Sequence, residues 1–189
     1  MSTALEGIAV VLGLAYLILA IWEKRSCWIA GGLASAIFMV IFWDAGLPMQ
    51  GLLQVFYLFM AALGWWRWGK DSSDTARTVS RVGWRYHATI VASLVLLSGI
   101  TLLARNTLTD LQAIVDTGSS WAGVLATWMV AQKKLESWIY WVVIDLLTAG
   151  LYLNAGLLAS SGLYLVYTVL AVIGWKQWRQ SLRLQATSS

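Results

Sequence analysis

Charged residues are scarce in this sequence. They make up 12% of the chain, whereas soluble domains carry about 25%. Hydrophobic residues reach 59%, and the mean hydropathy is +0.70. The deficit excludes an ordinary soluble domain and indicates an integral membrane protein in contact with the lipid bilayer. No basic face with interleaved aromatic residues is present, so nothing suggests nucleic-acid binding.

Cysteine and histidine are nearly missing as well. Cys27 is a single cysteine and cannot form an intramolecular disulfide. An enzyme or a metal site needs several nucleophiles, bases or ligands, so we expect no enzyme activity, no cofactor and no metal. His87 lies directly before an apolar run and is expected at the surface. Every Lys lies at the end of such a run, which excludes a retinal-type photoreceptor.

Long apolar runs are abundant. Seven can be marked, and each approaches the ~17–25 residues that span a bilayer. Unpaired backbone is not tolerated in lipid, so we predict an all-α membrane protein with seven transmembrane helices. The first run follows Glu6 without a basic segment, so we expect a retained span and not a signal peptide. The runs are Gly7–Trp22, Trp28–Trp43, Gly51–Trp66, Ala88–Ala104, Leu111–Ala131, Ser137–Leu153 and Gly156–Trp175.

The basic residues gather in alternate connections between these runs. With seven spans, one side of the membrane receives all Lys and Arg except Arg105. The other side receives Arg105 together with Asp44, Asp110 and Asp116. Basic residues accumulate on the cytoplasmic side. The bias therefore predicts an external N-terminus and a cytoplasmic C-terminus, as in a bacterial inner-membrane protein.

The sequence matches itself when it is shifted by 110 residues, without a gap. Internal symmetry of this kind indicates a repeated structural unit. Lys24, Trp28, Ile29, Leu53, Tyr57, Ala61, Gly64, Trp65 and Trp68 fall on Lys134, Trp138, Ile139, Leu163, Tyr167, Ala171, Gly174, Trp175 and Trp178. Ala45-Gly46-Leu47 falls on Ala155-Gly156-Leu157.

The repeat predicts an architecture. Spans two and three correspond to spans six and seven, four crossings apart, so the two halves run in the same direction. We predict a three-plus-one-plus-three parallel repeat: residues 1–68 as the first three-helix repeat, 69–104 as a cytoplasmic connector and linker helix, and 105–189 as the second repeat. Transporters built in this way bind substrate near the midplane between the halves and work by alternating access.

One stretch of the sixth run carries the strongest chemical signal. Trp138, Trp141 and Asp145 follow each other at i, i+3 and i+7, so they share one helix face. An acid inside a membrane span is costly and is therefore a functional candidate. Indole faces attract flat cations by ~0.5–2 kcal/mol. The stretch predicts a site for a cationic aromatic molecule.

At these residues the chain resembles the PnuC-type vitamin transporters, which have a SWEET-like fold. The similarity lies in Gly51–Tyr57 leading to Gly64-Trp65, and in Trp138–Asp145, which is similar to the family motif Trp-x-x-Trp-x-x-x-Asn. The resemblance implies seven helices in the three-one-three layout, homotrimers, and facilitated diffusion of a vitamin that a cytoplasmic kinase then traps by phosphorylation. Asp145 and Ser35 stand where the family's nicotinamide riboside carriers have Asn.

These replacements change the polar groups of the expected site, whereas the aromatic residues of the motif are kept. We therefore expect a different substrate that is still aromatic. A carboxylate can accept two parallel N–H bonds from an aminopyrimidine edge. Thiamine is therefore favoured over the alternative, nicotinamide riboside; a vitamin-binding subunit of an ATP-driven importer is a further alternative. The candidate substrate-binding residues are Trp138, Trp141, Asp145, Gln54, Tyr57, Ser35, Tyr164 and Tyr167.

Overall fold

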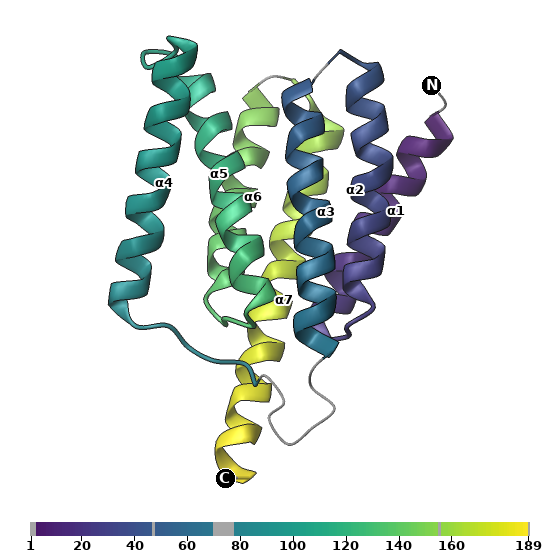
Figure 1. The fold of residues 1–189 in the computed structure, drawn as a ribbon, viewed down its shortest axis with the longest axis vertical. Coiled ribbons are helices and arrows are strands. Elements are labelled where there is room, and N and C mark those ends of the chain that lie inside the picture. Colours follow the sequence, from purple (N-terminus) through teal and green to yellow (C-terminus); the bar gives the residue numbers. More distant parts are fainter. Residues whose placement is uncertain (1–2, 47, 70–77, 155, 189) are drawn as a thin grey trace. The chain divides into compact units, whose positions relative to one another are not determined.

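Seven helices account for nearly all of the chain that the structure describes. The structure, a computed structural model, describes residues 3–46, 48–69, 78–154 and 156–188 (Figure 1). The prediction of an all-α protein with seven helices is confirmed for these residues. The helices are α1 (Thr3–Ile21), α2 (Cys27–Asp44), α3 (Pro48–Gly69), α4 (Trp84–Arg105), α5 (Leu111–Ala131), α6 (Ser137–Asn154) and α7 (Leu158–Ser188).

The last helix is longer than its apolar run. The run ends at Trp175, but α7 continues to Ser188. Lys176, Arg179 and Arg183 lie in this extension, which therefore lacks the hydropathy that marked the run while keeping a helical backbone. Among the described residues, α1, α2 and α4 are long and apolar enough to cross a membrane by length and composition.

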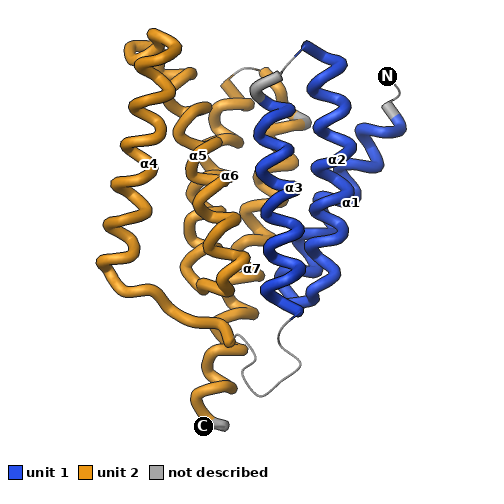
Figure 2. Tube along the Cα trace, in the orientation of Figure 1, with its two compact units in different colours: residues 1–77 blue, residues 78–189 orange. Residues whose placement is uncertain are grey.

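The chain divides into two compact units, residues 1–77 and 78–189 (Figure 2). In the first unit, α1 packs against α2 and α2 against α3. In the second unit, α4 packs against α5, α5 against α6 and α6 against α7. The three-plus-one-plus-three arrangement and its boundaries at 68/69 and 104/105 stay predictions.

The helix ends of the second unit are fixed by local hydrogen bonds. Asp110 caps α5, because its carboxylate accepts the backbone N–H groups of Gln112 and Ala113 at 2.9 and 3.3 Å. Asn106 ends α4 in the left-handed conformation, with φ of 54°. The predicted connector is described from Thr78 onward; residues 70–77 lie outside the described residues.

The described part of the connector binds the turn between α5 and α6. The Ser80 N–H donates to the Lys133 carbonyl at 3.1 Å, and the Leu135 N–H donates to the Ser80 carbonyl at 3.0 Å. Glu136 accepts from Arg81 Nε at 3.3 Å and from the Val82 N–H at 3.1 Å. Together these bonds hold the start of α4 near the start of α6.

Local geometry recurs in the two units at the 110-residue offset. The Trp28 and Trp68 rings meet edge to face at 5.5 Å and 88°, and the Trp138 and Trp178 rings meet at 5.4 Å and 88°. Each pair lies in one unit.

A glycine lies against the first ring of each pair. A Cβ on Gly64 would overlap the Trp28 indole, and one on Gly174 would come within 2.6 Å of the Trp138 indole. Close packing of this kind is typical of small residues between membrane helices.

The turns of the two units also correspond. Glu23 and Lys133, which follow α1 and α5, have positive φ of 54° and 52°. Gly46 and Gly156, which follow α2 and α6, have φ of 71° and 75°, a conformation that favours glycine. Leu47 and Ala155 of the matched turn lie outside the described residues.

Candidate functional site

Asp145 is a buried acid in the middle of α6. Its exposed fraction is 4%, and the residues beside it along the chain are Ile144 and Leu146. Its carboxyl group is close enough to the Tyr167 phenol on α7 for the two to interact electrostatically. The structure therefore brings together two residues that the sequence predicts for the site, 22 positions apart along the chain.

Tyrosines extend this group along α6 and α7. The ring of Tyr164 meets Tyr167 edge to face at 5.7 Å and stacks on Tyr152 at 5.4 Å with an interplanar angle of 29°. We call Asp145, Tyr152, Tyr164 and Tyr167 the acid–tyrosine cluster. Its aromatic rings and carboxyl group suit a flat cation with hydrogen-bonding substituents.

Trp138 lies in helix packing. Its exposed fraction is 1%, one ring face lies close to Gly174, and the ring contacts Trp178 edge to face. These contacts with α7 already surround the indole. A substrate contact at Trp138 would therefore have to replace contacts between α6 and α7.

Trp141 packs toward α5. It is half-buried against the cluster formed by Ala122, Ala126 and Ile144. The three predicted residues of α6 thus share a helix face in sequence, but Trp138 and Trp141 have different neighbours from Asp145. A helical period predicts which side chains share a face, and it does not predict which helix covers each of them.

The remaining predicted residues lie in the first unit. Ser35 on α2 is buried, and Gln54 and Tyr57 on α3 are half-buried. Tyr57 meets Phe56 edge to face at 5.6 Å and is close enough to Tyr16 on α1 to interact with it electrostatically. These residues are the repeat equivalents of Asp145, Tyr164 and Tyr167.

Two aromatic residues were missed by the sequence reasoning. Tyr152 lies seven residues after Asp145 on α6, so the same helical spacing could have found it. His87 was expected at the surface, yet it is half-buried. Its Nδ1 lies 2.9 Å from the Tyr140 hydroxyl, and the two rings stack at 5.9 Å. The expectation for His87 was wrong because α4 packs within the second unit. The hydropathy of a single run carries no information about packing between helices.

Residues 3–180 match the family model described as "Nicotinamide mononucleotide transporter". The chain belongs to this family. It is 24% identical over 207 residues to the nicotinamide riboside transporter PnuC of Escherichia coli (strain K12), covering 95% of this chain and 86% of the relative. The same figures hold for the nicotinamide riboside transporter PnuC of Shigella flexneri.

The fold is also that of a solved member. A crystal structure of the vitamin B3 transporter PnuC superimposes with a TM-score of 0.74 and 18% sequence identity, over 96% of this chain and 83% of that chain. The resemblance to PnuC-type vitamin transporters is therefore confirmed. These relatives are transporters, in agreement with the expectation that the chain is not an enzyme.

The comparisons change the order of the substrate predictions. The relatives are named for nicotinamide riboside and for vitamin B3. The preference for thiamine, which rested on Asp145 in place of Asn, is not supported by them. The alternative, nicotinamide riboside, is better supported.

Proposed function

We propose that this protein is a facilitative transporter of nicotinamide riboside in a bacterial inner membrane. The family match over residues 3–180 carries this proposal. The two nicotinamide riboside transporters that cover 95% of the chain support the choice of substrate.

The acid–tyrosine cluster supplies suitable chemistry. Nicotinamide riboside carries a pyridinium cation, ribose hydroxyls and an amide. The Asp145 carboxylate balances the cation and accepts hydrogen bonds from hydroxyl groups. The rings of Tyr164 and Tyr167 offer faces to the pyridinium, each with ~0.5–2 kcal/mol of attraction. Ser35, Gln54 and Tyr57 are the proposed contacts from the first half.

The proposed mechanism is alternating access in a three-plus-one-plus-three parallel repeat, with α4 as the linker. The matching Trp–Trp–Gly geometry and the matching turns of the two units support two like halves. One half rocks against the other around the substrate. The concentration gradient of the substrate drives net uptake, and a cytoplasmic kinase traps the imported substrate by phosphorylating it.

Assembly and orientation complete the proposal. The homotrimer and the kinase come from the family resemblance. The external N-terminus and the cytoplasmic C-terminus come from the distribution of Lys and Arg in the sequence. Cysteine labelling from each side of the membrane, at single sites near either terminus, tests the orientation.

Thiamine is the second candidate, and Asp145 favours it. A carboxylate can hold the aminopyrimidine edge of thiamine through two parallel bonds, whereas an asparagine would read the amide of nicotinamide more naturally. Both candidates are cations, so Asp145→Asn, which keeps the shape of the side chain and removes its charge, should weaken the binding of both. The loss should be larger for thiamine, because an asparagine can still bond the amide of nicotinamide riboside.

The decisive experiment is uptake by liposomes that contain the purified protein and no ATPase. Radiolabelled nicotinamide riboside is expected to enter, and excess unlabelled nicotinamide riboside is expected to compete better than thiamine. Stronger competition by thiamine, lost in Asp145→Asn, would establish the second candidate. Absence of uptake with either vitamin would contradict a transporter that works without an ATPase.

A further inference from the structure

Tyr152 on α6 is the residue of the acid–tyrosine cluster to which the proposed function gives no role. Its ring stacks on the Tyr164 ring of α7, with centroids 5.4 Å apart and an interplanar angle of 29°. The Tyr164 ring is nearly perpendicular to the Tyr167 ring, at 5.7 Å and 84°, and Tyr167 is the residue close to Asp145. The rings therefore form a continuous series from Tyr152, near the end of α6, to the acid in its middle.

The backbones of α6 and α7 are held together one turn from this stack. The Ser161 hydroxyl of α7 donates to the Ala149 carbonyl of α6 at 2.9 Å, and Ser161 is buried. Ser161 precedes Tyr164 by three residues, and Ala149 precedes Tyr152 by three. Residues three apart lie on the same side of a helix. The hydrogen bond thus fixes which residues of the two helices meet, while the stack sets the direction of the Tyr164 ring.

In the first unit the equivalent ring has a partner on its own helix. Phe42 on α2, the repeat equivalent of Tyr152, stacks on Phe38 of α2 at 5.8 Å with an interplanar angle of 18°. The equivalent of Phe38 on α6 is Thr148, whose hydroxyl donates to the Ile144 carbonyl at 2.8 Å. Since the residue four positions before Tyr152 carries no ring, Tyr152 stacks on α7 instead.

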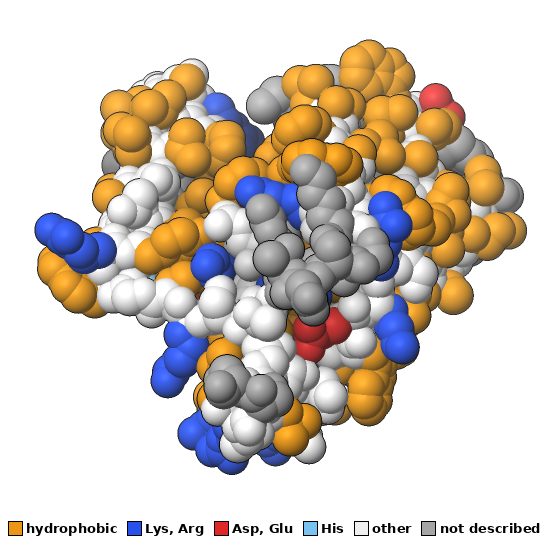
Figure 3. All heavy atoms as spheres, turned by 60° about the horizontal axis from the view of Figure 1, so that its bottom comes forward, with side chains coloured by type: hydrophobic (Ala, Val, Ile, Leu, Met, Phe, Trp, Pro, Cys, Tyr) orange, Lys and Arg blue, Asp and Glu red, His pale blue; other side chains and the backbone are white. Residues whose placement is uncertain are grey.

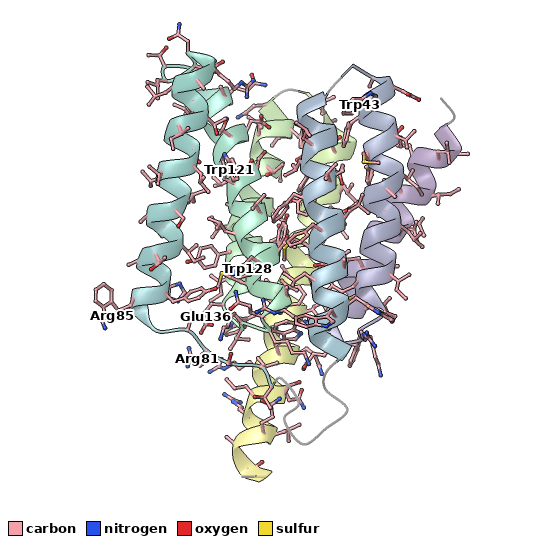
Figure 4. The ribbon with its side chains drawn as sticks, viewed as in Figure 1. Trp43, Arg81, Arg85, Trp121, Trp128 and Glu136 are labelled. Atoms are coloured by element: carbon pink, nitrogen blue, oxygen red, sulfur yellow. The ribbon has the colours of Figure 1, made fainter. Side chains whose placement is uncertain are left out.

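The residues that face this position from the next helix differ between the units as well. Gln54 on α3 is the equivalent of Tyr164, and Gly51 is the equivalent of Ser161. The helices are close together in the first unit too, because a Cβ on Gly51 would lie 3.2 Å from the Trp43 ring near the end of α2 (Figure 4). Glutamine has no ring and glycine has no hydroxyl, so neither the stack nor the hydrogen bond can form at these positions.

The stack lies at the end of α6 that the proposed orientation places outside the cell. Arg81 and Glu136 lie at the beginning of the helix (Figure 4), and Lys and Arg side chains gather on the face at this end (Figure 3). Basic residues mark the cytoplasmic side. Tyr152 lies close to Asn154, the last residue of α6. In this orientation a substrate that enters from outside passes the level of Tyr152 before it reaches Asp145.

We propose that Tyr152 is a positioning residue for substrate binding, which acts by holding the Tyr164 ring. This inference rests on the proposed function. In the stacked arrangement Tyr164 and Tyr167 offer a ring face and a ring edge to a flat cation beside Asp145, and a cation is attracted to an aromatic face. Without the stack the Tyr164 side chain is free to occupy other rotamers. Binding then has to order this side chain, which lowers the affinity.

A set of variants separates this role from simple packing. Tyr152→Leu removes the ring and keeps an apolar side chain at a half-buried position near the helix end, which should tolerate it. Tyr152→Phe keeps the ring. Phe42→Leu is the matched control, because it removes the equivalent ring from a stack within α2. Tyr164→Leu and the double variant Tyr152→Leu/Tyr164→Leu complete a double-mutant cycle. Melting temperatures in detergent show whether each variant is folded.

The measurement is the affinity of each purified protein for nicotinamide riboside and for thiamine by isothermal titration calorimetry. Tyr152→Leu should lower the affinity for the vitamin that the wild type binds about fivefold, as the loss of one aromatic contact would. Tyr152→Phe and Phe42→Leu should stay within about twofold of the wild type. In the Tyr164→Leu background, Tyr152→Leu should have no further effect.

The outcomes distinguish this inference from the proposed function. Unchanged affinity in a folded Tyr152→Leu, with binding by the wild type, would overturn the inference alone. So would an equal loss in Tyr152→Phe or Phe42→Leu, or the same loss in the Tyr164→Leu background, because Tyr152 would then not act through its stack on Tyr164. Absence of binding of either vitamin by the wild type would overturn both the inference and the proposed function.

Discussion

The two halves of the molecule keep the same framework and differ in chemistry. The edge-to-face tryptophan pairs and the glycines against their rings recur almost unchanged in α2–α3 and α6–α7. The polar positions do not recur: Ser35 in the first half corresponds to Asp145 in the second, and Gln54 corresponds to Tyr164. The packing of the helix pair is thus repeated, whereas the carboxyl group of Asp145 and the ring of Tyr164 have no equivalent at the matching positions of the first half.

A second difference concerns the helix that precedes each pair. In the first unit Tyr16 of α1 fills the space above Gly31, where a Cβ would lie 2.8 Å from the Tyr16 ring. In the second unit the equivalent residues are Ala126 and Trp141, which pack together. The large side chain is on α1, which precedes the helix pair, in the first unit, and on α6, a member of the pair, in the second unit. The space between the two helices is therefore filled in both units. This exchange explains why Trp141 packs against the cluster of Ala122, Ala126 and Ile144. Its role in substrate binding stays a prediction.

The largest effect is expected at Asp145. Asp145→Ala removes the buried carboxylate that balances the cation, a loss of ~2–5 kcal/mol. The affinity for nicotinamide riboside should fall at least about 30-fold, as measured by isothermal titration calorimetry. The matched change Ser35→Ala removes a neutral hydroxyl and should lower the affinity about fivefold or less. An equal loss of affinity in the two variants would contradict the proposal that Asp145 of the second half binds the cation.

The next largest effect tests whether the Tyr16 side chain and a large side chain at position 31 compete for the same space. Gly31→Trp places an indole where the Tyr16 ring lies and should destabilise the protein by about 3 kcal/mol, seen as a lower melting temperature in detergent. The double variant Tyr16→Ala/Gly31→Trp copies the arrangement of the second unit and should recover part of the loss, with a coupling energy of ~0.5–3 kcal/mol. Strictly additive effects would show that the two positions do not share one space.

The glycines against the tryptophan rings test the repeated framework. Gly64→Ala and Gly174→Ala should each destabilise the protein by about 1–2 kcal/mol, and by similar amounts, because the two indoles are held alike. Gly162→Ala is the control on α7, because nothing lies within 4 Å of its Cβ position; it should be neutral or stabilising by up to ~1 kcal/mol. Thermal unfolding of the three variants measures these changes. Destabilisation by Gly162→Ala as well would show that these helices do not tolerate alanine for glycine in general, and would contradict the argument from the tryptophan contacts.

The smallest effect is expected at the tyrosines. Tyr167→Phe removes a hydroxyl of the acid–tyrosine cluster and should lower the affinity for nicotinamide riboside about fivefold, as the loss of one hydrogen bond of ~1 kcal/mol to the substrate would. Tyr57→Phe, the equivalent change in the first half, should have a smaller effect. Quenching of tryptophan fluorescence by the ligand measures both. A larger effect of Tyr57→Phe would reverse the assignment of the two halves.

Much of the fold was predictable because membrane spans follow from length and hydropathy alone. Asp145 was found because an acid inside such a span is conspicuous. The basic extension of α7 to Ser188 was missed because its residues lack hydropathy. The surroundings of Trp141 depend on Ala126 of α5, and those of His87 depend on Tyr140 of α6. Contacts of this kind join distant segments, so no period within one helix could predict them.

The most direct test of the account is the uptake of radiolabelled nicotinamide riboside by liposomes that contain the wild type, Ser35→Ala or Asp145→Ala, without ATP and without an ion gradient. The account predicts that the wild type and Ser35→Ala bring the internal concentration to the external one and no further, and that Asp145→Ala stays at the background of empty liposomes. Uptake by Asp145→Ala at the wild-type rate, or no uptake by the wild type, would contradict it.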